Sequence, residues 1–149
     1  MIVSHPRLLP LAVVQVQLPK LFVVSRRRVL RYDPFQFTHQ GATWVGPEIQ
    51  KLRGITWGSD MDRAALRTDF DKVAAWAAAN RRPILLGEFG AFDKSGTPVG
   101  LRAAYVAAVR GEAERHGFGW SYWQFDSDFI VWDMNTQKWV QPILKALIP

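Results

Sequence analysis

Three short runs of apolar residues favour β-strands. Residues 29–32 form a brief run that ends at Asp33-Pro34. Residues 84–89 are almost continuously apolar, which is typical of a strand buried on both faces, as in a parallel sheet. Residues 118–125 form the third run and are rich in aromatic side chains. The sequence therefore predicts at least three strands, widely separated along the chain.

Three further stretches place apolar residues at the spacing of an α-helix. Thr68 is predicted to cap the first helix, with Asp71 three residues on, and this helix ends near Asn80. The second helix follows Thr97-Pro98, a cap and a proline at the first helical position, and stops at Gly117. The apolar stripes are Phe70, Val73, Ala74 and Ala77; then Leu101, Ala104, Tyr105, Ala108 and Val109; and, in a short final helix, Trp139, Ile143, Leu144 and Leu147.

Residues 33–60 are predicted to form a long loop, punctuated by glycine and proline. The loop carries four large aromatic residues, Phe35, Phe37, Trp44 and Trp57. Loops of this length in compact domains are usually functional or disordered, and an aromatic composition opposes disorder. We expect an ordered loop that packs against the rest of the domain.

The alternation of strand and helix, repeated about three times, indicates an α/β fold with right-handed parallel units. Three such units form either an open sheet with two exposed edges or the end of a larger barrel. The pattern alone leaves both alternatives open.

Composition places the chain among folded globular proteins, with 149 residues, 48% hydrophobic and 21% charged. The absence of cysteine excludes disulfides, thiolate metal sites and a cysteine nucleophile. The net charge of +6 is confined to residues 1–31, which carry six basic residues and no acid. Residues 32–149 hold 13 basic and 13 acidic residues, so the body of the chain is electrostatically neutral.

The basic segment, residues 1–28, differs in composition from the rest of the chain. Its apolar stretch, residues 8–24, is interrupted by proline, glutamine and lysine, so we expect no membrane span. A short apolar core after Arg7 lacks a small-x-small cleavage site, so export stays unassigned. The run 26–28 has three arginines without interleaved aromatics, and we expect a solvated turn rather than nucleic-acid binding.

Glu88 is the first candidate for chemistry, because it lies at the carboxyl end of a predicted buried parallel strand. Ligands bind at those strand ends in parallel α/β folds, and an unpaired buried carboxylate costs several kcal/mol. A carboxylate that caps a helix or pairs with an arginine explains the position equally well. Both interpretations stay open at this point.

The third predicted strand ends in a second group of candidates. Trp120 and Tyr122 share one face and are predicted to be core, whereas Trp123 and Gln124 lie nearest the strand end and suit contact with a sugar ring. The nearby aspartates lack the glycine turn and terminal glutamate of a calcium loop, and the histidines are scattered, so we expect no metal site.

These motifs together resemble glycoside hydrolase family 5, the bacterial cellulase-type endoglucanases. The resemblance covers residues 29–149 and rests on the order and spacing of DPFQFTHQGATW (33–44), GEFG (87–90), WSYWQF (120–125) and the closing residues 139–149. It implies a (β/α)₈ TIM barrel that hydrolyses β-glycosidic bonds with retention, and it implies no cofactor. A β-1,4-glucan is the implied substrate.

The resemblance also implies roles for individual residues. Glu88 matches the nucleophile on the seventh strand, and Tyr32 matches a tyrosine after the sixth strand that hydrogen-bonds the nucleophile. Trp123 matches the sugar-stacking tryptophan after the eighth strand. Gln124 and Trp44 are further candidates for substrate contact.

Two departures limit what this chain can do. The family's histidine two residues before the tyrosine is replaced by Leu30, and no Asn-Glu pair supplies the family's acid/base on the fourth strand. We therefore expect about three units, strands six to eight, of an incomplete barrel whose complete form has about 250 residues. Residues 1–28 are explained by a shifted reading frame, a wrong start, a gene fusion or a diverged segment that packs on the remainder.

Three functional hypotheses fit this sequence. The first is part of a retaining β-glucanase, inactive alone because the acid/base is absent. The second is a carbohydrate-binding remnant that keeps Trp44, Trp57 and Trp123 exposed, and the third is a non-functional fragment. Exposed strand edges predict that such a fragment aggregates or self-associates. The family is usually exported, but the sequence leaves localisation unknown.

Overall fold

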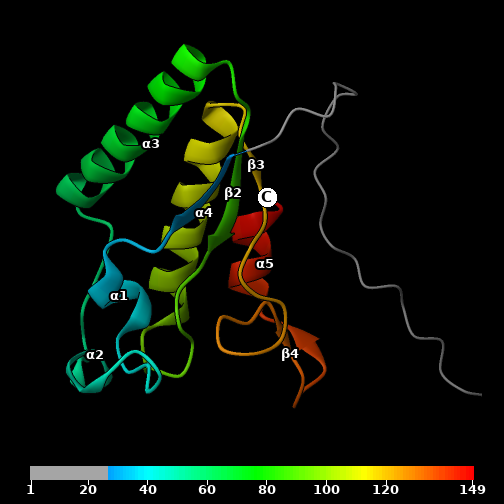
Figure 1. Ribbon diagram of the computed structural model, residues 1–149. Coiled ribbons are helices and arrows are strands. Elements are labelled where there is room, and N and C mark those ends of the chain that lie inside the picture. Colours follow the sequence, from blue (N-terminus) through cyan, green and yellow to red (C-terminus); the bar gives the residue numbers. More distant parts are fainter. Residues whose placement is uncertain (1–26) are drawn as a thin grey trace, which may run out of the picture.

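The computed structural model describes residues 27–149, and its centre is a three-stranded parallel sheet (Figure 1). The strands are β1 (Arg27–Arg31), β2 (Ile84–Phe89) and β3 (Gly119–Trp120), in the order β1-β2-β3. The predicted parallel α/β units are confirmed. Within the described residues the sheet stays open, and β1 and β3 are its edges. The expectations for residues 1–26 lie outside the described part.

The pairing of β1 with β2 contains one irregularity, at Gly87. Val29 lies opposite Leu86, and the next residue, Leu30, lies opposite Glu88. Gly87 is therefore an extra residue on β2, which is a β-bulge. Bulges redirect neighbouring side chains and are frequent next to active sites.

The third strand is shorter than predicted. Regular pairing ends at Trp120, although the Ser121 N–H still donates to Leu86 O at 2.8 Å and the Trp123 N–H to Phe89 O at 3.0 Å. The chain thus follows β2 as far as Trp123 without keeping regular strand geometry.

Helix α3 (Asp60–Asn80) begins eight residues before the predicted Thr68 cap. The cap is Ser59, whose hydroxyl accepts the Asp62 N–H at 3.2 Å while the Asp62 carboxylate accepts the Ser59 N–H at 2.9 Å. Thr68 instead lies inside the helix, and its hydroxyl donates to Ala64 O at 2.9 Å. The expected start was wrong because, in the first two turns, Leu66 is the one buried side chain, so these turns add little to the apolar stripe.

Helix α4 (Val99–Arg115) begins one residue after the predicted Pro98. Thr97 does not cap it, because its hydroxyl is paired with Ser95 Oγ at 2.6 Å. The predicted stop is confirmed: Gly117 has φ +67°, a left-handed conformation that favours glycine.

The C-terminal part contains a small hairpin that the sequence did not predict. Strands β4 (Trp132–Asp133) and β5 (Lys138–Trp139) pair antiparallel, and α5 (Gln141–Leu147) follows them. Trp139 belongs to β5 rather than to the predicted helix. Two-residue strands are too short to show the alternation from which a strand is predicted.

The loop between β1 and α3 is ordered, as expected, and holds two short helices. These are α1 (Phe35–His39) and α2 (Pro47–Lys51). The side chain of Gln40 is fully buried and ties the loop together: its amide donates to Ile55 O at 2.8 Å and accepts the Ile55 N–H at 2.9 Å.

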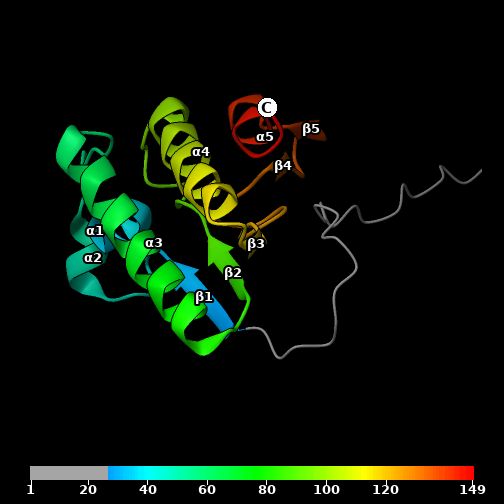
Figure 2. The ribbon, with the colours of Figure 1, turned by 90° about the horizontal axis from the view of Figure 1, so that it is seen from above.

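The helices α3, α4 and α5 lie on one face of the sheet, as the view from above shows (Figure 2). The core between them is apolar and is made of side chains that include Leu66, Phe70, Leu86, Phe89, Tyr105, Val109 and Ile143. None of the described helices covers the opposite face. Arg28 and Leu30 of β1 are exposed, whereas the alternate residues Val29 and Arg31 are half-buried. No helix within residues 27–149 is long and apolar enough to cross a bilayer.

Candidate active site

Glu88 lies near the carboxyl end of β2, one residue beyond the bulge at Gly87. Its side chain is 20% exposed, so it is largely removed from water but still reachable. Gly90 lets the backbone of Trp123 approach β2, because a Cβ at Gly90 would meet Trp123 O and come within 3.0 Å of the Phe129 ring. Gly87 and Gly90, near Glu88 on either side, thus allow neighbouring atoms to pack closely against the end of β2.

Tyr32 follows β1 directly and reaches the same carboxylate. Its hydroxyl donates to Glu88 Oε2 at 3.2 Å. Burial and the negative charge of Glu88 raise the pKa of Tyr32 well above its ordinary value, so the phenol keeps the proton that it donates. The ring packs edge-on against His39 at 5.0 Å and Phe129 at 5.9 Å.

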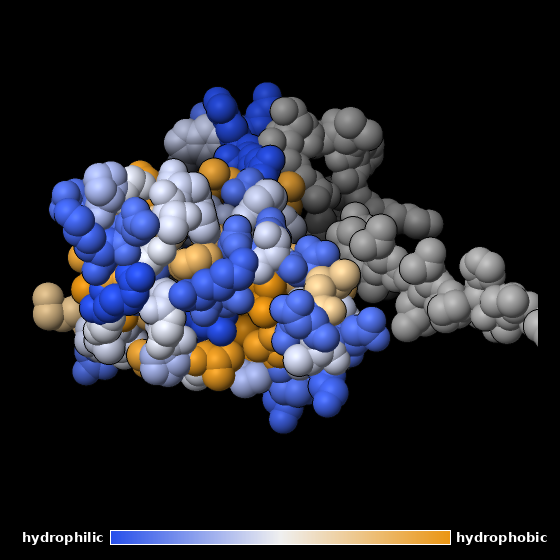
Figure 3. Space-filling model, turned by 90° about the horizontal axis from the view of Figure 1, so that it is seen from below, coloured by the Kyte–Doolittle hydropathy of each residue, from blue (hydrophilic) through white to orange (hydrophobic). Residues whose placement is uncertain are grey.

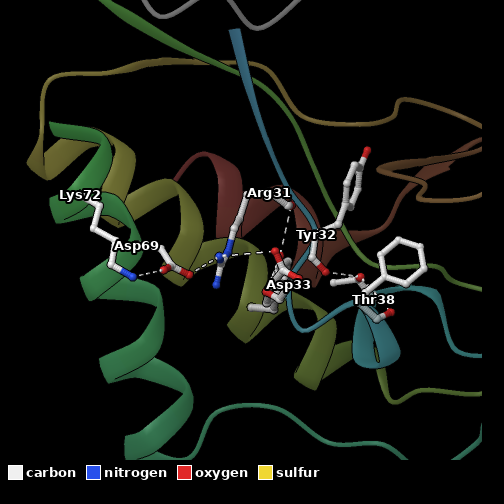
Figure 4. Close-up of polar contacts among 8 residues, drawn as sticks. Arg31, Tyr32, Asp33, Thr38, Asp69 and Lys72 are labelled. Atoms are coloured by element: carbon white, nitrogen blue, oxygen red, sulfur yellow. Dashed lines mark hydrogen bonds and ion pairs between the residues drawn. The ribbon is translucent and has the colours of Figure 1, made fainter. Parts of the chain in front are cut away.

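The backbone on both sides of Tyr32 is anchored by polar contacts (Figure 4). The Thr38 hydroxyl of α1 donates to Tyr32 O. Arg31 Nη1 lies 2.6 Å from Asp69 of α3 and 3.7 Å from Asp33. These contacts connect the end of β1 to α1 and α3, and so fix the position from which Tyr32 reaches the carboxylate.

Arg28 of β1 is a second partner of Glu88. Its Nη2 donates to Glu88 Oε1 in an ion pair, so each carboxylate oxygen accepts one hydrogen bond from β1 or the residue after it. The arginine-paired interpretation of Glu88 is therefore realised together with the tyrosine contact. Sequence reasoning missed Arg28 because it was assigned to a basic run, although Arg28 and Tyr32 are four residues apart and share a strand face.

Exposed aromatic side chains lie around this strand end. Trp123 is 43% exposed, Gln124 beside it is half-buried, and Trp44 is 53% exposed. The Trp44 ring packs edge-on against Phe92 at 4.9 Å, and Phe92 contacts Phe129, which packs on Tyr32. The face seen from below, where the strands end, shows apolar residues in its middle with hydrophilic residues around them (Figure 3).

Three further aromatic side chains lie in or against the core, and one of them was expected to be exposed. Trp57 is 4% exposed and packs edge-on against Tyr105 at 5.2 Å, so its expected exposure to a ligand was wrong. Trp120 is buried and Tyr122 packs against the core, as predicted from their shared face.

The other three glutamates are engaged or placed elsewhere. Glu112 pairs with Arg115 at 2.7 Å, and Glu114 pairs with Arg110 and accepts the Trp120 indole N–H at 3.3 Å, all at the end of α4. Glu48 is exposed on α2. Among residues 27–149 no group of three or more histidine, aspartate and glutamate side chains is placed to hold a metal ion.

His39 is a buried residue near the site that the sequence did not single out. It is 7% exposed, stacks on Phe35 at 4.0 Å and has its Nδ1 2.9 Å from the Thr38 hydroxyl. Burial lowers the pKa of His39 to about 4, so the ring is neutral at pH 7. A lone histidine in a predicted loop carries no sequence signal for such burial.

A parallel α/β sheet with a hydrogen-bonded carboxylate at a strand end is typical of α/β proteins that bind ligands at this edge of the sheet. Comparison with known proteins identifies the family. The model of the family Cellulase (glycosyl hydrolase family 5) matches residues 30–129. Endoglucanase H of Acetivibrio thermocellus is 28% identical over 122 residues, and Endoglucanase B of Clostridium cellulovorans is 48% identical over 101 residues. This chain belongs to glycosyl hydrolase family 5.

Solved structures agree with this membership. Thermotoga maritima Cel5A, in complexes described with mannotriose and with cellobiose, superposes with a TM-score of 0.79 at 36% identity and covers 89% of this chain. The fold is therefore related to the TIM barrel. The matches to Endoglucanase H and Endoglucanase B cover 78% and 62% of this chain. This chain in turn spans only 42% of Cel5A, 12% of Endoglucanase H and 22% of Endoglucanase B.

Proposed function

We propose that this chain carries the nucleophile side of a retaining β-1,4-glucanase site, with Glu88 as the nucleophile. The observation that carries the proposal is the hydrogen bond of 3.2 Å from the Tyr32 hydroxyl to Glu88 Oε2, at the carboxyl end of a parallel strand. That hydrogen bond orients the carboxylate group of Glu88. Trp123, Gln124 and Trp44 would contact the sugar.

The proposed step is a displacement at the anomeric carbon. A carboxylate oxygen of Glu88 attacks C1, the bond from C1 to the glycosidic oxygen breaks, and a covalent glycosyl ester forms. A poor leaving group also needs a proton from a second carboxyl about 5 Å away. The remaining glutamates lie on α2 or form ion pairs on α4, so we propose that this chain alone leaves natural β-glucan uncleaved.

The place of the sheet in the barrel belongs to the same proposal. We assign β1, β2 and β3 as the sixth, seventh and eighth strands, which puts Glu88 on the seventh. The face of the sheet that the described helices leave uncovered would then be the barrel interior, since in TIM barrels the helices form the outer ring. The exposed positions of Arg28 and Leu30 on that face support this assignment.

The test uses a substrate that needs no acid catalyst. In 2,4-dinitrophenyl 2-deoxy-2-fluoro-β-cellobioside, dinitrophenolate leaves without protonation, and the fluorine slows hydrolysis of the ester. We expect slow labelling of the chain, located to Glu88 by peptide mass spectrometry, and none in Glu88→Gln. Labelling elsewhere, or equal labelling of Glu88→Gln and Glu48→Gln, would contradict the assignment.

A second function, carbohydrate binding without cleavage, is favoured by the exposure of Trp44 and Trp123. Titration with cello-oligosaccharides should change tryptophan fluorescence, and Trp123→Ala should remove most of that change. Trp76→Ala is the matched control, because Trp76 is a similarly exposed tryptophan, 39%, on α3. A flat titration, or one that Trp76→Ala alters more, would refute binding at the strand end.

The domain division and the sheet edges carry two smaller proposals. We propose residues 29–149 as part of the catalytic domain and residues 1–28 as an atypical basic segment of different origin, whose last two residues, Arg27 and Arg28, extend β1. An Asn-Glu codon pair in another frame within about 400 nucleotides upstream of the Val29 codon, the length that about 130 barrel residues require, would support this division, and its absence would oppose it. The edges of β1 and β3, which have no partner strand within residues 27–149, are proposed to promote self-association, which light scattering at rising concentration tests.

A further inference from the structure

We propose that Arg28 is a positioning residue that acts as a reversible latch on Glu88: its guanidinium holds Oε1 and slows attack by that oxygen on a sugar until it leaves. The inference rests on the proposed function of Glu88 as the nucleophile. It goes beyond that function by giving a second residue a definite and opposing effect on the reaction.

The contact takes both oxygens of the carboxylate. Oε1 accepts from Arg28 and Oε2 accepts from Tyr32. Each oxygen keeps a second lone pair, but a hydrogen bond from a cation withdraws electron density from Oε1 and so slows its attack on the anomeric carbon. Release of the charged donor therefore favours the reaction. Tyr32 is the fixed partner, because its ring is packed between His39 and Phe129 and the backbone around it is anchored. Arg28 is the mobile partner, because its side chain is 59% exposed.

The bulge at Gly87 provides the path by which Arg28 reaches Glu88. A Cβ placed on Gly87 would lie 2.6 Å from Arg28 Cγ and 2.9 Å from Arg28 Cδ, closer than such atoms can come. The arginine stem therefore lies directly over this glycine. Gly87 is buried and its φ is outside the left-handed region, so alanine fits the backbone but not the stem of Arg28.

The chain also holds a matched control. Arg27 carries the same charge on the neighbouring residue, but its guanidinium lies over the Trp76 ring at 5.6 Å. Removing Arg27 changes the net charge as much as removing Arg28 does, without touching the carboxylate.

The experiment measures how fast Glu88 is modified by a water-soluble carbodiimide with glycine ethyl ester, followed by peptide mass spectrometry. In this reaction the carboxyl adds to the carbodiimide and the amine then displaces the urea to form an amide, so the rate reports a free carboxyl oxygen. Exposed ion pairs are weak, so we expect Arg28→Ala to raise the rate about two- to fivefold. Gly87→Ala should raise it similarly by displacing the intact arginine, and Arg27→Ala should not.

Salt gives an independent check, because it screens a partly exposed ion pair. Raising the ionic strength should accelerate modification in the parent chain and leave Arg28→Ala unchanged. Equal rates in Arg28→Ala and Arg27→Ala, or a slower rate in Gly87→Ala than in the parent, would overturn the latch.

The fluorosugar separates the latch from the proposed function. We expect Arg28→Ala to be labelled at Glu88 faster than the parent by the same factor as in the carbodiimide assay. Equal labelling rates would overturn the latch as a feature of the reaction. Absence of labelling in every variant, with the carbodiimide rates still separated, would refute Glu88 as the nucleophile while upholding the contact.

Discussion

Replacing Gln40 by methionine tests whether a buried amide holds the loop that positions Tyr32. Gln40 is fully buried, and its side chain makes three hydrogen bonds to the backbone: two with Ile55, at 2.8 and 2.9 Å, and one to Phe37 O, at 3.2 Å. Methionine has a similar length and shape but no comparable donor or acceptor. The change therefore removes the hydrogen bonds and adds little steric conflict.

The expected loss follows from these contacts. A net hydrogen bond contributes about 1 kcal/mol, and a buried backbone group left without a partner costs about 1–3 kcal/mol. The N–H and C=O of Ile55 would both lose their partner, so we expect the free energy of unfolding to fall by about 2–4 kcal/mol. At a slope of roughly 2 kcal/mol per molar, the urea midpoint should fall by about 1–2 M.

The assay is urea unfolding followed by circular dichroism and by tryptophan fluorescence, with Gln36→Met as the control. Gln36 is exposed on α1, so its replacement should change stability by less than about 0.5 kcal/mol. A Gln40→Met variant within that range, with an unchanged slope, would refute the claim that this amide organises the loop.

Three further predictions concern stability. Burial lowers the pKa of His39 to about 4, whereas its value in the unfolded chain is about 6.5, so the unfolded chain binds more protons between these pH values. The free energy of unfolding should therefore be highest above pH 6.5 and fall by up to about 3 kcal/mol as the pH drops to 4. His39→Gln should flatten that part of the profile, and an unchanged slope would contradict the cause. Ser59→Ala should cost about 1 kcal/mol in urea unfolding, and Thr68→Ala less than about 0.5; the reverse order would refute the observed cap. Gly111 lies inside α4 with open space around it, so Gly111→Ala should raise the melting temperature by adding about 1 kcal/mol to the free energy of unfolding. Gly117 has φ +67°, so Gly117→Ala should lower the melting temperature by a similar energy. A shift of the same sign and size in both variants would contradict the conformational argument.

The elements that were predictable are those whose local pattern agrees with their tertiary environment. Strand β2 is buried on the helix side and flanked by neighbours, so its apolar run identified it. Helix α4 faces the core over most of its length and ends at a glycine with positive φ. The first turns of α3 are mostly exposed and are held by the capping box at Ser59, so the apolar stripe suggested a start that was too late.

The candidate site shows the same division. The family resemblance implied that Tyr32 hydrogen-bonds Glu88, and the hydrogen bond between them is present. The burial of Trp57 was not predictable, because it depends on the contact with Tyr105, 48 residues further along the chain. Arg28 was missed because it belongs to the arginine run 26–28, which was interpreted as a solvated turn.

By itself the sequence determined the parallel α/β class, the family and the strand end that carries Glu88. These features can be predicted from the sequence because apolar periodicity, glycine positions and short motifs each depend on residues that are close together in the chain. Only the tertiary structure decided which donors reach the carboxylate, which tryptophans face solvent and which face of the sheet the helices of residues 27–149 cover. These depend on how separate segments pack: Arg28 and Glu88 are 60 residues apart, and a bulge at one glycine allows them to touch.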